Sequence, residues 1–370
     1  MARFVVAERL SVRGEGLGNE MIPWAKGFIA SQVLNAHLVG PSWGLNRRRY
    51  WRNFKTSRLD FVGEELLRLL PHEAFAEEDY YDTGVADYGE ALRVWALRKN
   101  LTRKRHFVVT VGGMDGGYLA IESAHAFLWS RLLNSRNALS NIFKVRFNVS
   151  QQKLLIAVHM RLGDDFADAE VGRDIRSRFN VRVPISWYRG LCEALRREFS
   201  GQIQFLFFTD RETPEYLRIV SEYNPDQIRN RQLSECSDLI LMATADLRIC
   251  SVSSYSLAAC FLSRGPYVWY EPQLCIDHGV YSLWGHEPRQ QRAGSPTRLS
   301  ASKVESISKA SDFQLLGYPV GLDSLLPDSL VNHLHIALAK KDPRMDLIQY
   351  GCVPLGAAVP ASESILGREG

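Results

Sequence analysis

The sequence predicts an α/β protein built from two Rossmann-like, doubly wound domains. Its 370 residues are enough for two domains, each with a large hydrophobic core. Apolar runs typical of buried strands alternate with helical patterns through both halves of the chain, as in domains where helices cover both faces of a parallel sheet. We expect a first domain over 1–150, a second over 151–290, and a linker, a helix and a flexible tail over 291–370.

The first half contains two units in which a strand, a glycine loop and a helix follow one another. Residues 4–7 predict a strand, GEGLGN at 14–19 a loop and 21–35 a helix, and the same order returns from 106–111 onward. Glycine lets the backbone N–H groups at a helix N-terminus approach a ligand closely. The loop is not a dinucleotide-binding fingerprint, because Asn19 stands where the last glycine would be. It therefore predicts either a ligand-binding turn of another kind or a tight connection.

The second half continues the alternation more regularly. Strands are predicted over 154–158, 204–208, 246–250 and 267–270, with helices within 184–199, 214–223, 237–243 and 257–262. Helical spacing returns at 324–340, and 139–150 is interpreted as the link between the halves. Residues 41–105 give no clear pattern, and their many aromatic side chains are interpreted mainly as core residues.

The composition is that of an ordinary soluble globular protein. Hydrophobic residues make up 46% of the chain and charged residues 23%, and the formal net charge is +4. This mild charge does not predict a nucleic-acid partner, although it suits peripheral contact with an anionic membrane surface. The six cysteines form no CxxC pair, and no apolar stretch is long enough to span a membrane. We therefore expect a cytoplasmic protein with no metal site and no integral membrane segment.

Polar side chains follow three predicted strands of the second half, at the point where each strand ends. The three groups are His159, Arg161 and Asp164; Thr209 and Asp210; and Ser253, Ser254 and Ser256. The carboxyl ends of parallel strands meet at one edge of a sheet, which is where such sheets bind ligands. The planar fork of Arg161 suits two phosphate oxygens, and serines at a helix N-terminus add hydroxyls, N–H groups and a favourable dipole. The pattern predicts a pyrophosphate site; an Arg–Asp surface pair and a serine helix cap are the alternatives.

Three motifs, taken in order, resemble one known family. They are GLGNEM at 16–21, HxRxGD at 159–164 and the segment ADLRICSVSS at 245–254. All three are similar to motifs of the GDP-fucose-dependent fucosyltransferases that make α1,2 and α1,6 linkages, a superfamily that includes the protein O-fucosyltransferases. The likeness covers roughly residues 3–35 and 150–272. HxRxGD alone is moderately specific, and the three motifs in order are much more so.

This resemblance implies a GT-B-like fold, in which two Rossmann-like domains face each other across a cleft. The first domain would be the acceptor side, and the second would bind the nucleotide sugar. Arg161 and Asp164 would be the catalytic residues, with Arg161 holding the β-phosphate and stabilising the departing GDP. Ser253 and Ser254 would bind the pyrophosphate.

The resemblance also assigns further donor-binding residues. Asp238 falls where the family places a carboxylate on the guanine edge, since a carboxylate can accept from both N1–H and N2–H; a helix N-terminal charge is the alternative. His159 would line the base or ribose pocket, or would simply be a hydrogen-bonded histidine at a strand end. Gly16, Gly18 and Asn19 of the first glycine loop would complete the donor site.

The implied reaction moves fucose from GDP-fucose to a hydroxyl of a glycan or glycoconjugate acceptor, with inversion and without a metal or other cofactor. The general base stays open among Asp165, Asp168 and Glu170, which all follow the HxRxGD motif. Two alternative functions also stay open. One is transfer of another sugar from GDP, and the other is a catalytically silent protein that binds a nucleotide or a glycan.

Overall fold

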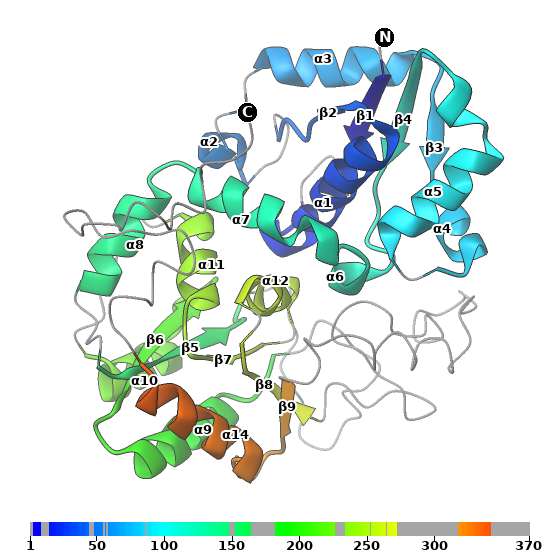
Figure 1. The fold of residues 1–370 in the computed structure, drawn as a ribbon. Helices are drawn as coiled ribbons and strands as arrows, with labels where there is room; N and C mark the ends of the chain where they lie inside the picture. The colour runs from blue at the N-terminus through cyan, green and yellow to red at the C-terminus, as the bar shows by residue number, and fades with distance from the viewer. Residues whose placement is uncertain are drawn as a thin grey trace, which may run out of the picture.

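The protein contains two parallel β-sheets flanked by helices (Figure 1). The computed structural model describes residues 3–8, 15–43, 48–54, 56, 58–85, 87–147, 152–163, 182–225, 234–251, 253–263, 265–271 and 317–341. Every strand pair in both sheets is parallel. The predicted α/β class with two parallel sheets is therefore confirmed.

The first sheet has the strand order β2-β1-β4-β3. Its strands are β1 (Arg3–Ala7), β2 (His37–Val39), β3 (Glu73–Phe75) and β4 (Phe107–Val111). Helix α1 (Leu17–Leu34) packs on β1, β2 and β4, which fits its almost continuous burial. The strand predicted at the start of the chain is β1, and the helix predicted over 21–35 is α1, which begins earlier, at Leu17, so that Leu17, Gly18 and Asn19 of the predicted loop lie in its first turn.

In the stretch that gave no clear pattern, 41–105, the described residues form several helices and one strand, β3. The helices are α2 (Trp51–Phe54), α3 (Arg58–Leu69), α4 (Glu77–Thr83), α5 (Tyr88–Arg98) and the 3₁₀ turn η1 (Leu101–Arg103). Most of its aromatic residues do form core, as predicted. Trp43, Tyr50, Tyr80 and Trp95 are buried and Tyr81 is partly buried, whereas Trp51 is exposed. Within this region, α3 carries apolar residues at the helical spacing of three and four, at 59, 62, 66 and 69.

The second sheet has the order β6-β5-β7-β8-β9, with β5 near its centre. The strands are β5 (Leu154–Met160), β6 (Ile203–Thr209), β7 (Leu247–Ile249), β8 (Tyr267–Tyr270) and β9 (Gly317–Val320). The helices of this half are α9 (Ile185–Phe199), α10 (Pro214–Tyr223), α11 (Glu235–Ala243), α12 (Ser254–Ser263) and α14 (Asp328–Ala339). The predicted strands and helices of this half are present.

Two corrections concern the end of the chain. The strand at 267–270 is not the last one, because β9 pairs with it in parallel. Helix α14 contributes Leu330 and Leu334 to the core beneath β5, so the second sheet and its helices extend beyond the 151–290 range. The predicted linker at 291–311 and the tail from 343 lie outside the described residues.

Both faces of β5 are buried, which explains its unbroken apolar run. Leu154, Ile156 and Val158 face a core formed with α9, α10 and α14. Leu155 and Ala157 point the other way, into a core that includes α11 and α12 and continues into the first domain. A central parallel strand covered by helices on both sides needs apolar residues at every position.

The two domains pack directly against each other. Helix α1 contacts α12, and α11 contacts α7 (His125–Leu133) and α8 (Ala138–Phe147). Residues 139–147 of the segment interpreted as a link are therefore part of helix α8 at this interface, and 148–150 lie outside the described residues. The short elements α6 (Gly117–Ala120) and η2 (Glu122–Ala124) lead into α7. Among the described residues, no helix is both long and apolar enough to cross a membrane.

Candidate functional site

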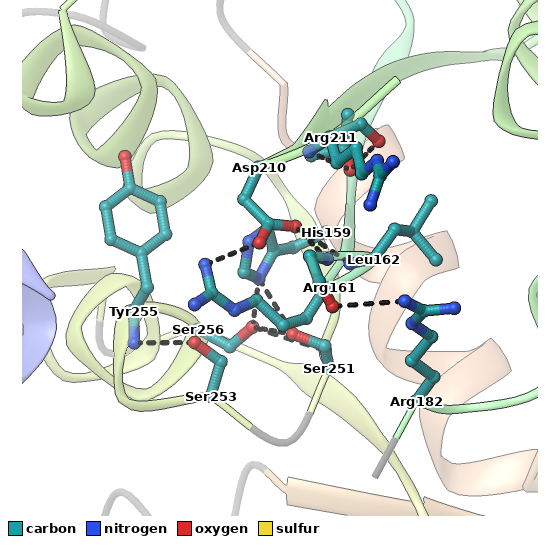
Figure 2. Close-up of polar contacts among 12 residues, drawn as sticks. His159, Arg161, Leu162, Arg182, Asp210, Arg211, Ser251, Ser253, Tyr255 and Ser256 are labelled. Carbon is teal, nitrogen blue, oxygen red and sulfur yellow. Dashed lines mark hydrogen bonds and ion pairs between the residues drawn. The ribbon is translucent and has the colours of Figure 1, made fainter. Parts of the chain in front are cut away.

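The carboxyl ends of three neighbouring strands place the predicted polar residues at one edge of the second sheet. Met160 at the end of β5 pairs with Thr209 at the end of β6, and Val158 pairs with Ile249 at the end of β7. The residues that follow β5, β6 and β7 therefore lie near one another. Figure 2 shows the resulting cluster, in which side chains from the three strand ends contact each other.

His159 joins the end of β5 to the loop before α12. Its Nδ1 lies 2.7 Å from Ser256 Oγ and 2.9 Å from Ser251 Oγ, and the two hydroxyl oxygens are 3.3 Å apart. All three side chains are buried. Burial lowers the pKa of His159 to about 4, with a further lowering by the Arg161 charge and an opposing effect of Asp210. The imidazole is therefore neutral at physiological pH and acts here as a hydrogen-bonding group.

Arg161 is held by an acid that follows β6. Its Nη1 lies 2.8 Å from Asp210 Oδ2, and both side chains are partly exposed. The other carboxylate oxygen, Oδ1, accepts hydrogen bonds from the backbone N–H of Leu162 at 2.8 Å and of Gly163 at 3.1 Å. Asp210 thus fixes both the guanidinium of Arg161 and the backbone turn that follows it (Figure 2).

Gly163 is required by this close approach of Asp210. A Cβ at position 163 would collide with the Asp210 carboxylate. The Gly163 carbonyl also accepts a 3.2 Å hydrogen bond from Arg182 Nη2. The glycine of the HxRxGD motif therefore has a steric role in this chain, because a side chain there would displace the partner of Arg161.

The serine loop starts helix α12 earlier than predicted, at Ser254 rather than at 257. Ser253 Oγ accepts a hydrogen bond from the backbone N–H of Tyr255 at 3.2 Å, so this hydroxyl caps the first turn. Ser253 and Ser254 are partly exposed, whereas Ser251 and Ser256 are buried against His159. The loop thus divides into inner hydroxyls that hold His159 and outer serines at a helix N-terminus.

The first glycine loop reaches this same helix end from the other domain. A Cβ on Gly18 would collide with the backbone of Ser254 and Tyr255. Gly18 is the second residue of α1 and Ser254 the first of α12, so two helix N-termini lie against each other. The carbonyl of Gly18 accepts a 2.6 Å hydrogen bond from Tyr118 Oη. Two adjacent helix N-termini concentrate N–H donors and positive dipole ends, the arrangement that anions favour.

Gly16 and Asn19 flank that contact. Gly16 is the N-cap residue of α1, and a Cβ there would meet no atom within 4 Å. Asn19 is partly exposed, in the first turn of α1. Of the three glycine-loop residues, the structure therefore brings Gly18 into contact with the N-terminus of α12.

Asp238 lies in the first turn of α11, whose N-cap is Ser234. Its side chain is partly buried, and burial together with the nearby Glu235 raises its pKa to about 7. Tyr255 connects this helix to the cluster around His159. Its ring centroid lies 5.3 Å from that of His159, and its hydroxyl donates to the carbonyl of Glu235. Asp238 therefore lies at a helix N-terminus, as the alternative interpretation stated.

The remaining predicted residues lie outside the described part of the chain. These are the catalytic candidate Asp164 and the three candidate bases Asp165, Asp168 and Glu170. Within the described ranges, no group of three or more His, Cys, Asp or Glu side chains is arranged to hold a metal ion. The described cysteines Cys192, Cys236, Cys250 and Cys260 are free and buried.

Sequence reasoning did not assign roles to Asp210, Ser251 or Tyr255. The position of Asp210 directly after a predicted strand does indicate a place at the edge of the sheet. Its pairing with Arg161, however, depends on the register between β5 and β6, which is set by the tertiary structure. Ser251 stands only two residues before Ser253, and its partner His159 lies on another strand. Local sequence could not show which serines face inward.

No protein-family model matches this chain, and comparison with curated proteins finds no match. Comparison with solved structures finds matches at low sequence identity, among them the following three. POFUT1 in complex with GDP-fucose is 14% identical, with a TM-score of 0.42, over 72% of this chain and 97% of that one. POFUT1 in complex with GDP is 13% identical, with a TM-score of 0.41, over 72% and 98%. The fucosyltransferase NodZ from Bradyrhizobium is 15% identical, with a TM-score of 0.39, over 70% and 93%.

Proposed function

We propose that this chain is a glycosyltransferase that moves fucose from GDP-fucose to a hydroxyl of a glycan or glycoconjugate acceptor. The observation that carries the proposal is the placement of Arg161. It is held by Asp210 at the carboxyl edge of the second sheet, directly after strand β5, whose His159 is hydrogen-bonded to the loop that starts α12. That loop in turn meets the N-terminus of α1. A guanidinium beside two helix N-termini suits a pyrophosphate.

In this proposal the donor lies along the edge of the second sheet. Arg161 contacts the β-phosphate, and the outer serines Ser253 and Ser254 donate to the pyrophosphate. Gly18 allows the two helix N-termini to approach, and Gly16 and Asn19 extend the site from the first domain. The first domain then carries the acceptor.

Asp238 is proposed to accept from the guanine N1–H and N2–H groups. Both contacts need the ionised carboxylate, and the pKa of about 7 places this group near its titration midpoint at neutral pH. His159 supports the site through its serine contacts, since the neutral imidazole holds the loop without adding charge.

The proposed reaction breaks the bond between the fucosyl anomeric carbon and the β-phosphate oxygen. The bonding electrons go to that oxygen, and the acceptor oxygen attacks the opposite face of the sugar, which inverts the anomeric centre. Arg161 stabilises the charge that develops on the leaving phosphate; removing one preorganised donor of this kind costs about 10²–10³-fold in rate. Asp164 is proposed as a second catalytic residue, and the acceptor proton passes to one of the acids that follow it.

The first test is a thermal-shift comparison of GDP, UDP, ADP and CMP. A ligand at 100 times its Kd stabilises the protein by about 2.7 kcal/mol, which is a few degrees for a chain of this size. We expect a shift with GDP, and a much smaller one for Arg161→Ala. Arg189→Ala is the matched control, because Arg189 also forms an ion pair, at 3.3 Å with Glu222, on the surface of the same domain.

The second test is turnover of GDP-fucose, scored as donor hydrolysis or transfer. Arg161→Ala should lose at least about 100-fold in rate while Arg189→Ala keeps it. Equal stabilisation by all four nucleotides, or normal turnover by Arg161→Ala, would contradict the proposal. Turnover of a different GDP-sugar would support the proposed phosphate site but would show that the donor sugar is not fucose.

A further inference from the structure

Helix α3 exposes an apolar stripe to solvent. Leu59 and Leu69 are 81% exposed, Leu66 59%, Leu70 50% and Val62 49%. Spacings of three and four residues place these five side chains on one face of the helix and of its C-terminal end. Single exposed leucines are ordinary, but a contiguous apolar row marks an interaction surface. We call these five residues the α3 stripe.

The opposite face of α3 carries charge and is turned toward the protein. Glu64 is completely buried; its carboxylate accepts from the backbone N–H of Ser42 at 2.9 Å and pairs with Arg68 at 2.7 Å. A surface helix of a protein surrounded by water normally has the reverse orientation, with apolar side chains inward. The helix is therefore held in place by a buried charged group while its leucines remain outside.

Exposed cationic and aromatic side chains lie next to the stripe in the chain. Arg48, Arg49 and Arg52 are exposed at and before α2, and the Arg52 guanidinium lies 5.3 Å from the ring centroid of Trp51. Trp51 itself is more exposed than most aromatic residues here. Figure 1 shows α3 along the outer side of the first domain, away from the second sheet, with α2 below one end of it; residues 55–57 separate the two helices in the chain. Leucine, tryptophan and arginine together are the composition of surfaces that bind anionic lipid interfaces.

A second copy of the chain fits this surface less well. The 12 residues of α3 give a helix about 18 Å long and about 10 Å wide, so the stripe covers on the order of 200 Å². A stable protein interface buries about 800 Å² on each partner. A lipid surface has no such threshold, because binding grows with the apolar area inserted and with the basic charge beside it.

We propose that the α3 stripe and the arginines before it dock this protein onto an anionic membrane surface. The leucines enter the boundary between headgroups and acyl chains, and Arg48, Arg49 and Arg52 contact acidic headgroups. The inference rests on the first domain alone. It goes beyond the proposed transfer reaction and holds whatever the donor is.

The test is sedimentation of the purified full chain with lipid vesicles. One set contains phosphatidylcholine only, and the other contains phosphatidylcholine and phosphatidylserine in equal parts. We expect binding to the second set, weakened by salt. The variant Leu59→Gln/Leu66→Gln/Leu69→Gln should bind at least about tenfold more weakly, since it removes most of the inserted area. Arg48→Gln/Arg49→Gln/Arg52→Gln should lose the preference for phosphatidylserine.

The matched control changes three exposed apolar residues of the second domain, Leu322→Gln/Leu325→Gln/Ile336→Gln. This variant should bind vesicles as the wild type does. Equal binding by the leucine variant and the wild type overturns the proposal, and so does a wild-type chain that binds neither vesicle set. A dimer in light scattering that the leucine variant converts to a monomer also overturns it, because a second copy would then cover the stripe.

Discussion

Arg161 depends on residues that are distant from it in sequence. Asp210 accepts from the Leu162 and Gly163 N–H groups and pairs with the guanidinium, so one carboxylate orients the whole end of the motif. A charged hydrogen bond of this kind is shorter and stronger than a neutral one. The geometry of Arg161 is therefore set before any ligand arrives, which is what preorganised stabilisation of a leaving phosphate requires.

The titration of Asp238 gives a prediction at the same scale. Its pKa is about 7 in the folded protein, against an ordinary value near 3.9 in an unfolded chain. The folded state therefore holds a proton that the unfolded state releases, and this group makes the free energy of unfolding fall as pH rises from about 4 to about 7. The variant Asp238→Asn cannot ionise. The difference in free energy of unfolding between this variant and the wild type should therefore favour the variant more at pH 8 than at pH 5. Urea unfolding at both pH values measures this.

The same ionisation should affect nucleotide binding in the opposite sense. If the carboxylate accepts from guanine, GDP affinity should fall about tenfold from pH 8 to pH 6, as the ionised fraction falls. Asp238→Asn should bind GDP weakly at both values. A stability difference that is the same at pH 5 and pH 8 would show that Asp238 does not titrate as its burial implies.

At the scale of elements, the contact between the N-termini of α1 and α12 is the most constrained feature. Gly18→Ala should push these helices apart, because the new Cβ meets the Ser254 and Tyr255 backbone rather than a flexible side chain. We expect a loss of about 1–3 kcal/mol in stability and weaker GDP binding. Alanine normally favours a helix by about 1 kcal/mol over glycine. A loss of stability in Gly18→Ala would therefore indicate the steric contact with α12.

Gly16→Ala is the control within the same loop. Its backbone φ is −63° and a Cβ there meets no neighbour, so its stability should stay close to wild type. Melting temperature compares the two variants. Equal behaviour of both would mean that the helix ends are not in the contact described.

At the scale of the molecule, one hydrophobic core continues from the first domain into α11, α12 and one face of β5. His125 and Trp129 of α7 also contact the Leu262 carbonyl at the end of α12, each at 2.9 Å. These shared groups predict that the two sheets unfold together. Calorimetry and far-UV circular dichroism should show a single coincident transition.

Two adjacent leucines of β5 test this coupling. Leu155→Ala opens the core shared with the first domain, and Leu154→Ala opens the core beneath α9 and α14. Both side chains are fully buried, so each change should cost about 2–5 kcal/mol and lower the same transition. Two separate transitions, with only one moved by each variant, would mean that the domains unfold independently.

Much of the fold was predictable wherever local pattern and tertiary environment agree. The LLIAV run required a strand buried on both faces, and the structure places it at β5 between two cores. Helix α3 has apolar residues at helical spacing, but local sequence could not show that this apolar face points outward while the buried face carries Glu64. Strand β9 is short, contains Pro319 and lies far along the chain from its partner β8, so pairing rather than composition makes it a strand.

The candidate site was likewise predictable only in part. The sequence by itself determined that polar groups follow buried strands and that glycines precede α1, because strand ends and turns are local features. Only the tertiary structure decided that Asp210 holds Arg161, that Ser251 and Ser256 rather than Ser253 and Ser254 face His159, and that Gly18 touches Ser254. The physical reason is that strand register and domain packing bring together residues that are far apart in sequence. The energies that set both are summed over whole cores, so no short motif contains them.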